Sequence, residues 1–166
     1  MKELKVFMDY RRFFARKAEE VAKDLLGRLL LRNTEKGSTS ARILEVGAYE
    51  EGNETESRAG MQYGPARLFL MPYRGTFLLN IATDKEMYPS CVEIRQVATH
   101  EKTVKGSGAV ANFFGITQDL DGLLLGDEIQ ILGEPVDKSQ IKKTRGSADN
   151  CLGFYSIRKL KGGEAK

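Results

Sequence analysis

The first candidate for chemistry in this chain is a carboxylate on a predicted β-strand. Glu45 lies in the run Ser40–Tyr49, whose composition is typical of a strand, and Gly47 follows two residues later. Residues two apart project from the same strand face, with Cα atoms about 6.5 to 7 Å apart. Such a carboxylate can accept a proton from water or orient polar neighbours, and both interpretations stay open. Glu51, just beyond the strand, is the second candidate.

The other residues that could take part in catalysis or binding are an arginine, a Gly-rich stretch, two cysteines and one histidine. Arg95 alternates with Glu93 on a second predicted strand, which by itself suggests a solvated ion pair. The stretch Lys105–Gly108 precedes a predicted helix and suits either a phosphate at the helix N-terminus or a flexible entry. Cys91 and Cys151 lie far apart, and the chain has one histidine. We therefore expect no metal, no disulfide and no cofactor.

The composition is that of an ordinary globular domain. The 166 residues are 41% apolar and 30% charged, which suits one domain with a buried core. The net charge of +3 and the isoelectric point near 8.8 permit a polyanionic partner without requiring one. No apolar run approaches a membrane span, and the N-terminus lacks the pattern of a signal peptide. We therefore expect an intracellular, cytoplasmic protein that does not bind membranes.

The predicted elements place strands in groups between helices. One helix is predicted over Tyr10–Leu26, with Asp9 as its cap, and a shorter one over Ser107–Phe114. The predicted strands are Arg28–Arg32, Ser40–Tyr49, Arg67–Met71, Thr76–Ala82, Cys91–Val97, Glu128–Leu132 and Gly153–Arg158. This grouping favours the α+β class: a single domain over residues 1–160 with a curved, mostly antiparallel sheet and flanking helices. Residues 161–166 are expected to form a flexible tail.

Segments spread over the chain match the motifs of one enzyme family in order and spacing. They are Phe13–Ala15, Val21–Gly27, Arg42–Tyr49, Ala66–Phe69, Tyr73, Asn80, Val92–Val97, Gly106–Ile116 and Gly153–Tyr155. On these motifs the region from Arg12 to Lys159 resembles the alkyladenine (3-methyladenine) DNA glycosylases. The family strand R-I-V-E-x-E-A-Y corresponds to Arg42–Tyr49, and the family strand V-L-L-R-A-x-E-P corresponds to the segment that starts at Val92.

The resemblance implies a base-excision repair enzyme that flips an alkylated purine out of duplex DNA and excises it. It also implies a fold similar to the C-terminal domain of formyltransferases, and a monomer associated with the nucleoid. Arg95 is then catalytic and helps to hold the attacking water, and Glu45 is the first candidate for the catalytic carboxylate, with a polar residue that orients pocket neighbours as the alternative. The other implied contacts are Tyr49, Phe69 and Asn80 in the base pocket, and Tyr73 as a wedge with Arg67, Arg74 and Ser107 on the DNA.

Without the resemblance, the aromatic residues have plainer interpretations. Tyr49 and Phe69 are then core aromatics, because aromatic side chains in strands usually pack. Tyr73 is then a turn residue, since it follows Pro72 in a sequence typical of a β-turn. Their pocket and wedge roles therefore depend on the family assignment.

The chain departs from the family pattern at positions that matter for activity. The second Glu of the R-I-V-E-x-E-A-Y strand is the family's catalytic base, and Gly47 stands in its place. A pocket His is missing from Asn53–Arg58, the Arg-rich loop is shortened near Met61–Pro65, and the Lys of G-P-G-K-L is Ala109. Reduced activity is therefore expected, with Gly47→Glu raising excision at least about tenfold. The alternative is a catalytically inactive nucleic-acid-binding or interaction module on the same fold.

Overall fold

The longest strand, β2 (Gly37–Tyr49), organises the computed structural model of this chain, which describes residues 8–50, 63–146 and 151–158. One edge of β2 pairs with β5 (Cys91–Ala98). The other edge is shared, because β1 (Leu29–Thr34) pairs with its first half and β9 (Cys151–Ile157) with its second half. Both edges of the second half of β2 are therefore paired with neighbouring strands, and its side chains project onto the two faces of the sheet.

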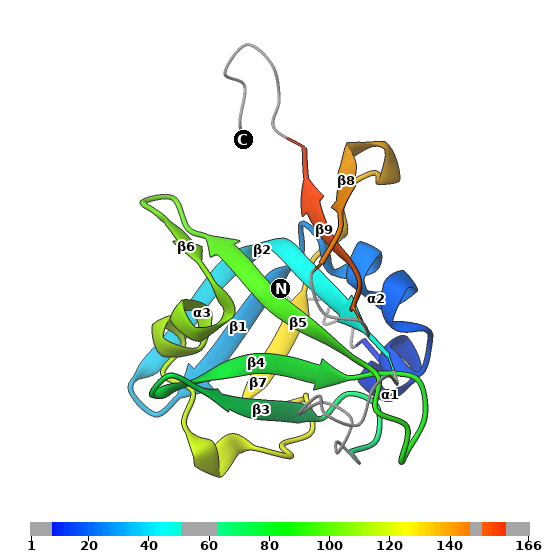
Figure 1. Ribbon diagram of the computed structural model, residues 1–166. Helices are drawn as coiled ribbons and strands as arrows, with labels where there is room; N and C mark the ends of the chain where they lie inside the picture. The colour runs from blue at the N-terminus through cyan, green and yellow to red at the C-terminus, as the bar shows by residue number, and fades with distance from the viewer. Residues whose placement is uncertain (1–7, 51–62, 147–150, 159–166) are drawn as a thin grey trace, which may run out of the picture.

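The remaining strands complete one antiparallel sheet that curls around the core (Figure 1). They are β3 (Leu68–Tyr73), β4 (Thr76–Ala82), β6 (Thr103–Lys105), β7 (Ile129–Leu132) and β8 (Ile141–Thr144). The main order is β3-β4-β5-β2-β1-β7, with β6 on β5 and β8 on β9. The curl brings the two ends of the sheet together, since Leu30 and Ile129 line the same small internal space as Leu68 and Ile81. The predicted α+β class and curved antiparallel sheet are confirmed.

Two short helices replace the single helix predicted over Tyr10–Leu26. They are α1 (Tyr10–Phe14) and α2 (Ala18–Leu25). The prediction is wrong because Ala15 leaves the helical region, with ψ of 51°, and Lys17 is extended, with ψ of 142°. The break lets Phe14 and the apolar face of α2 reach the core together, where both are buried.

A third helix, α3 (Ser107–Phe113), packs on β4 and β5. It ends one residue earlier than predicted, and Gly115 follows with φ of +65°, a conformation that favours glycine. At the start of α1, the carboxylate of Asp9 accepts a hydrogen bond from the backbone N–H of Arg12, which confirms the predicted cap. The sequence does not predict β6 and β8, because both strands are short and mostly exposed.

The core face of the sheet reveals an irregularity in its two central strands. On β2 the buried apolar residues step from Ile43 to Val46, and on β5 from Ile94 to Val97. Strict alternation gives steps of two residues, so each strand carries one extra residue at this point. The pairing register shifts here and leaves Arg95 of β5 without a direct partner on β2. Such β-bulges are frequent beside active sites, where they re-aim a side chain.

Two 3₁₀ turns complete the described elements: η2 (Gln118–Leu120) and η3 (Lys138–Gln140). Across residues 8–50, 63–146 and 151–158, no helix has the length and hydropathy needed to cross a membrane. The predicted domain boundary at residue 160 and the predicted tail 161–166 lie outside the described residues.

Candidate functional site

Five strands contribute one residue each to a single row on the face opposite the core. The paired positions are, in order across the sheet, Phe154 (β9), Gly47 (β2), Glu93 (β5), Asn80 (β4) and Phe69 (β3). Directly paired residues on neighbouring strands share a face, so these side chains project together. The row joins two aromatic rings, a carboxylate and an amide across the middle of the sheet.

A second row lies two residues further along β2, at Tyr49. Tyr49 pairs with Cys91 on β5 and with Cys151 on β9. Its buried ring belongs to a small apolar cluster that includes Phe69 and Phe154 and is separate from the main core. A whole strand separates Cys91 from Cys151, so their Cα atoms are about 9.5 Å apart, beyond the reach of a disulfide.

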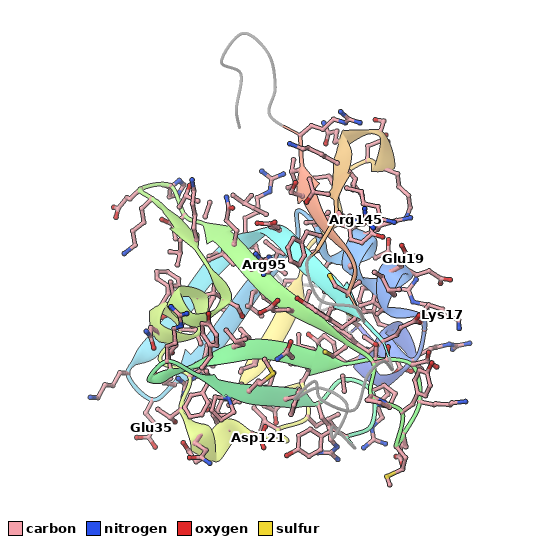
Figure 2. The ribbon with its side chains drawn as sticks, viewed as in Figure 1. Lys17, Glu19, Glu35, Arg95, Asp121 and Arg145 are labelled. Atoms are coloured by element: carbon pink, nitrogen blue, oxygen red, sulfur yellow. The ribbon has the colours of Figure 1, made fainter. Side chains whose placement is uncertain are left out.

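Arg95 draws two carboxylates together over β2 and β5, and Figure 2 shows it above the middle of the sheet. Its Nη1 donates to Glu93 Oε1 at 3.2 Å, and its Nε lies 3.7 Å from Glu45 Oε2. Tyr49 Oη donates to the same Glu93 oxygen at 3.1 Å. The Glu93 side chain is only 3% exposed, against 23% for Glu45 and 29% for Arg95. The Glu93–Arg95 pair suggested by the sequence is present, and its carboxylate end is buried rather than solvated.

Aromatic rings close the space above Gly47. A Cβ atom at this position would lie 3.1 Å from Phe154 Cδ1 and 3.2 Å from Tyr49 Cε1. The guanidinium carbon of Arg95 lies 3.8 Å from the centre of the Phe154 ring, which is a cation–π contact. Gly47 is not one of the glycines with a positive φ. Backbone conformation therefore does not oppose a side chain at position 47, but the neighbouring rings must shift by a few tenths of an ångström to admit one.

Phe69 is held at the outer end of the row by neighbours that the sequence does not single out. Tyr63 meets it edge to face, with ring centroids 6.1 Å apart. Asp121, which follows η2 and is labelled below β3 in Figure 2, accepts hydrogen bonds from Tyr63 Oη at 2.5 Å and from the Leu70 backbone at 2.8 Å. The bond to Asp121 raises the pKa of Tyr63 above its ordinary value of 10.0. Asn80 is buried, and its Nδ2 donates to the Phe69 carbonyl at 3.2 Å.

Tyr73 and Arg74 form the tip of the β3–β4 hairpin. Tyr73 is 46% exposed, and the guanidinium carbon of Arg74 lies 5.1 Å from the centre of its ring. Arg74 and Gly75 have φ of +48° and +81°, as a two-residue hairpin turn with left-handed central residues requires. Tyr73 follows Phe69 by four residues on β3, a distance of about 13 Å along the strand.

Arg67 and Ser107 have partners inside the fold. Arg67 Nη1 donates to the Gly122 carbonyl at 2.8 Å, which ties the segment after η2 to β3. Ser107 is buried, and its hydroxyl accepts a hydrogen bond from the Leu79 backbone at 2.8 Å, which ties α3 to β4. Neither side chain belongs to the row, and the DNA contacts expected of them stay predictions.

The structure brings most of the residues singled out by the sequence to one face: Glu45, Tyr49, Phe69, Asn80 and Arg95. Sequence reasoning assigned no site role to three further members of the site, Tyr63, Glu93 and Phe154. A signal for Glu93 was present, because the family strand that Val92–Val97 resembles has an apolar residue at that position. Phe154 lies in the motif segment Gly153–Tyr155, whereas nothing local marks Tyr63, whose hydroxyl bonds Asp121 in a distant part of the chain.

Two predicted features lie outside the described residues: Glu51, and the segment Asn53–Arg58 in which the family His is missing. The shortened loop near Met61–Pro65 is described only from residue 63 onward. In the described part of the chain, no group of three or more His, Cys, Asp or Glu side chains could hold a metal ion. The row and its neighbours offer two carboxylates for proton transfer and one guanidinium for holding water or an anion.

Comparison with known proteins shows what this chain is similar to. The profile of the methylpurine-DNA glycosylase (MPG) family matches residues 12–146. A protein of Anaeromyxobacter sp. (strain Fw109-5), described as a "putative 3-methyladenine DNA glycosylase", is 29% identical over 150 residues, which cover 81% of this chain and 77% of the relative. A protein of Methanocella arvoryzae with the same description is 31% identical over 139 residues, covering 68% and 69%. A third, of Streptomyces avermitilis, is 41% identical over 63 residues, covering 33% and 30%.

Proposed function

We propose, from the premise that this chain belongs to the methylpurine-DNA glycosylase family, that it is a base-excision repair protein acting on duplex DNA. The observation that carries the proposal is the cluster of Glu45, Glu93 and Arg95 beside the rings of Tyr49 and Phe69. A flipped base needs a ring to stack on, and hydrolysis of its glycosidic bond needs a carboxylate beside a water. One face of this sheet supplies both groups.

The proposed reaction removes an N-alkylated purine from its sugar. Such a base carries a positive charge and leaves readily once water is held on the opposite face of the sugar. Tyr49 and Phe69 stack on the flipped base, Asn80 supports this pocket through its bond to the Phe69 carbonyl, and Arg95 holds the water for a carboxylate. A general base contributes about 10² to 10⁴ in rate. Because Gly47 removes the family's base from β2, excision is slower than in a family member that keeps a carboxylate there.

The proposed DNA contact uses the tip of the β3–β4 hairpin. Tyr73 is exposed there and is braced by Arg74, so it is the candidate wedge that fills the gap left by the flipped nucleotide. Phosphate contacts dominate the affinity of such proteins, so duplex binding weakens steeply with salt. The protein acts as a monomer at the nucleoid and needs no cofactor, since water is the only co-substrate.

The test is a base-release assay with the purified chain on duplexes that carry an N-methylpurine, a deaminated purine or an etheno adduct. We expect slow release of the N-methylpurine and none from unmodified duplex. Arg95→Ala, purified in the same way, must lose the release, because residual activity in that variant indicates a contaminating enzyme. If excess protein releases no base from any of these lesions, the enzymatic proposal fails.

A second candidate function is a catalytically inactive DNA-binding module on the same fold. The packing above Gly47 favours it, because Phe154 and Tyr49 occupy the space of the family's catalytic side chain. Binding of lesion duplex at low salt without any base release would support this candidate. If the chain neither binds duplex at low salt nor releases a base, an interaction module with another partner is the better description.

A further inference from the structure

We propose that Glu93 is the general base of this site and takes over the function that the family assigns to position 47. This assignment rests on the proposed function. It makes Glu93 the base, whereas the sequence alone favours Glu45. In the register of the sheet, Glu93 on β5 is the direct partner of Gly47 on β2. The carboxylate missing from one strand is present at the paired position of its neighbour.

Distances along and across the sheet favour Glu93 over Glu45. Directly paired Cα atoms lie about 4.5 to 5.5 Å apart, whereas residues two apart on one strand are separated by about 6.5 to 7 Å. Glu93 thus starts about 2 Å closer to Gly47 than Glu45 does. A misplacement of about 1 Å can lower a rate by a factor of 10². The register therefore gives Glu93 the better position from which to replace the missing side chain.

Hydrogen bonds hold the Glu93 carboxylate beside the space above Gly47. Its Oε1 accepts from Tyr49 Oη at 3.1 Å and from Arg95 Nη1 at 3.2 Å. Both donors border that space, because Tyr49 Cε1 lies 3.2 Å from a Cβ built at position 47, and Arg95 stacks on the adjacent Phe154 ring. The carboxylate is therefore oriented by groups that also lie beside position 47.

The burial of Glu93 also calls for a function. Its neighbours on β5, Val92 and Ile94, face the apolar core, and Glu93 itself is 2% exposed. Even when it is paired, as Glu93 is with Tyr49 and Arg95, a buried carboxylate often stabilises a fold no more than an apolar residue of similar volume, so strand packing alone does not explain Glu93. The family strand that this segment resembles has Leu there and Glu at the position of Gly47. Relative to the family motifs, this chain therefore lacks a Glu at position 47 on β2 and has an additional Glu at the paired position on β5.

Glu45 then becomes a positioning residue for Arg95. Its Oε2 lies 3.7 Å from Arg95 Nε, which is an ion-pair distance and not a hydrogen bond. With Glu93 on Nη1 and Glu45 on Nε, the guanidinium is held from two sides against the Phe154 ring. We assign to Arg95 the holding of the water and to Glu93 the acceptance of its proton.

The step balances as a hydrolysis. The water oxygen forms a bond to C1′ of the sugar while the bond between C1′ and the purine nitrogen breaks. The electron pair of the broken bond goes to the purine and cancels the positive charge of the alkylated base. One water proton moves to the Glu93 carboxylate and is later released to solvent, which leaves an abasic sugar and a neutral free base.

The experiment measures single-turnover release of an N-methylpurine from duplex DNA as a function of pH. The proteins are the wild type, Glu93→Gln, Glu45→Gln and the control Glu20→Gln, which changes an exposed carboxylate on α2. Binding to a duplex with an abasic-site analogue is measured in parallel. We expect Glu93→Gln to lower the rate at least about 100-fold and to abolish the loss of rate at acid pH. Its binding should stay within about threefold, as for Glu20→Gln.

The Glu45→Gln variant distinguishes the roles of the two carboxylates. As a positioning variant it should lower the rate by a smaller factor and keep the acid limb of the pH profile. If Glu93→Gln keeps wild-type rate and pH dependence while Glu45→Gln loses both, the assignment is overturned and Glu45 is the base. If the wild type releases no base at all, the proposed function itself fails, which is a different outcome from an active Glu93→Gln protein.

Glu93→Asp keeps the experiment decisive if the Gln variant does not fold. It retains the charge and shortens the side chain by one methylene, so a general base would be misplaced by about 1 Å. We expect at least a tenfold lower rate with the acid limb of the profile retained. A folded Glu93→Asp protein with full activity would overturn the assignment.

Discussion

The ring of Phe154 lies directly against Gly47, its partner across β2 and β9. A Cβ atom on Gly47 would approach Phe154 Cδ1 to 3.1 Å and Cε1 to 3.2 Å, closer than most Cβ contacts. The observed position of the Phe154 ring therefore suits a residue without a side chain at position 47. A side chain at position 47 requires the ring to move, and Arg95, stacked 3.8 Å above that ring, must move with it.

Gly47→Ala should lower the free energy of unfolding by about 1 to 3 kcal/mol, because the added methyl group overpacks against Phe154 and Tyr49. Urea unfolding measures the change. Gly126→Ala is the matched control, since nothing lies within 4 Å of a Cβ at that position and its φ is ordinary. The control should change stability by no more than about 0.5 kcal/mol. Equal effects of the two substitutions would contradict the packing argument.

Gly47→Glu should not restore activity by itself, contrary to the tenfold gain expected from the sequence. Its side chain meets the same ring and places a second carboxylate directly opposite Glu93, where like charges repel. Base release should stay at or below the wild-type rate. Combining Gly47→Glu with Glu93→Leu removes the repulsion and should release base faster than Gly47→Glu alone. A gain of tenfold or more from Gly47→Glu alone would show that the site accommodates both carboxylates.

Tyr49→Phe should destabilise the protein by about 1 to 3 kcal/mol, because it removes one hydrogen bond to a buried carboxylate and leaves the ring in place. Thermal or urea unfolding measures the loss, and base release should fall as well, since Glu93 is less well oriented. Tyr73→Phe is the control, because Tyr73 is exposed at a hairpin tip and should tolerate the change within about 0.5 kcal/mol. Equal stability of wild type and Tyr49→Phe would argue that the Glu93 contact is not maintained in solution.

Tyr73→Ala should reduce release from duplex DNA more than release from single-stranded DNA. A wedge fills the gap in a base stack, and a single strand has no paired stack to fill. Base release from both substrates measures the ratio. Met87→Ala, another exposed apolar side chain, should leave that ratio unchanged. Equal losses on the two substrates would assign Tyr73 to general DNA contact and not to wedging.

The link between α2 and β9 makes stability depend on pH on the acid side. Tyr155 Oη donates to Glu19, and this bond, aided by Lys143, lowers the pKa of Glu19 below its ordinary value of 4.5. A lowered pKa stabilises the fold above pH 4.5, and this contribution is lost as the pH falls through the folded pKa. Figure 2 shows Glu19 on α2. Tyr155→Phe should therefore be less stable by about 1 kcal/mol near neutral pH, and the difference should shrink below about pH 4.

Tyr10→Phe is the control for this prediction. Tyr10 Oη donates to the backbone carbonyl of Ile131 at 3.2 Å, a partner that does not titrate. Its loss should lower stability by a similar amount at every acid pH. Urea unfolding between about pH 3 and pH 7 compares the two variants. Parallel curves for Tyr155→Phe and wild type would mean that Glu19 does not carry the effect.

Much of the fold and part of the site follow from local sequence. Short runs of strand-forming residues predicted seven strands whose type is confirmed, and the turn sequence that begins at Pro72 lies at the β3–β4 hairpin. The helix break after Phe14 could not be predicted, because nothing at Ala15–Lys17 opposes helix formation locally. The break is set by tertiary packing of Phe14 and α2 in one core.

By itself the sequence determined which residue types are available to the site. It carries Arg95 and two strand carboxylates, it places glycine at position 47, and its motifs identify the family. Those conclusions need only residue identity and spacing along the chain. They favoured Glu45, because Glu45 is the nearest carboxylate to Gly47 on the same strand.

Only the tertiary structure decided which of these residues meet. Glu93 lies 46 positions from Gly47 in the sequence, and strand pairing makes it the direct neighbour. The bulges in β2 and β5 leave Arg95 without a register partner on β2, and its side chain pairs with Glu93 and Glu45. Strand β9 brings Phe154 to the same place from a distant part of the chain. Register is set by how both strands bury their apolar residues in a shared core, which is a property of the whole sheet and not of either segment.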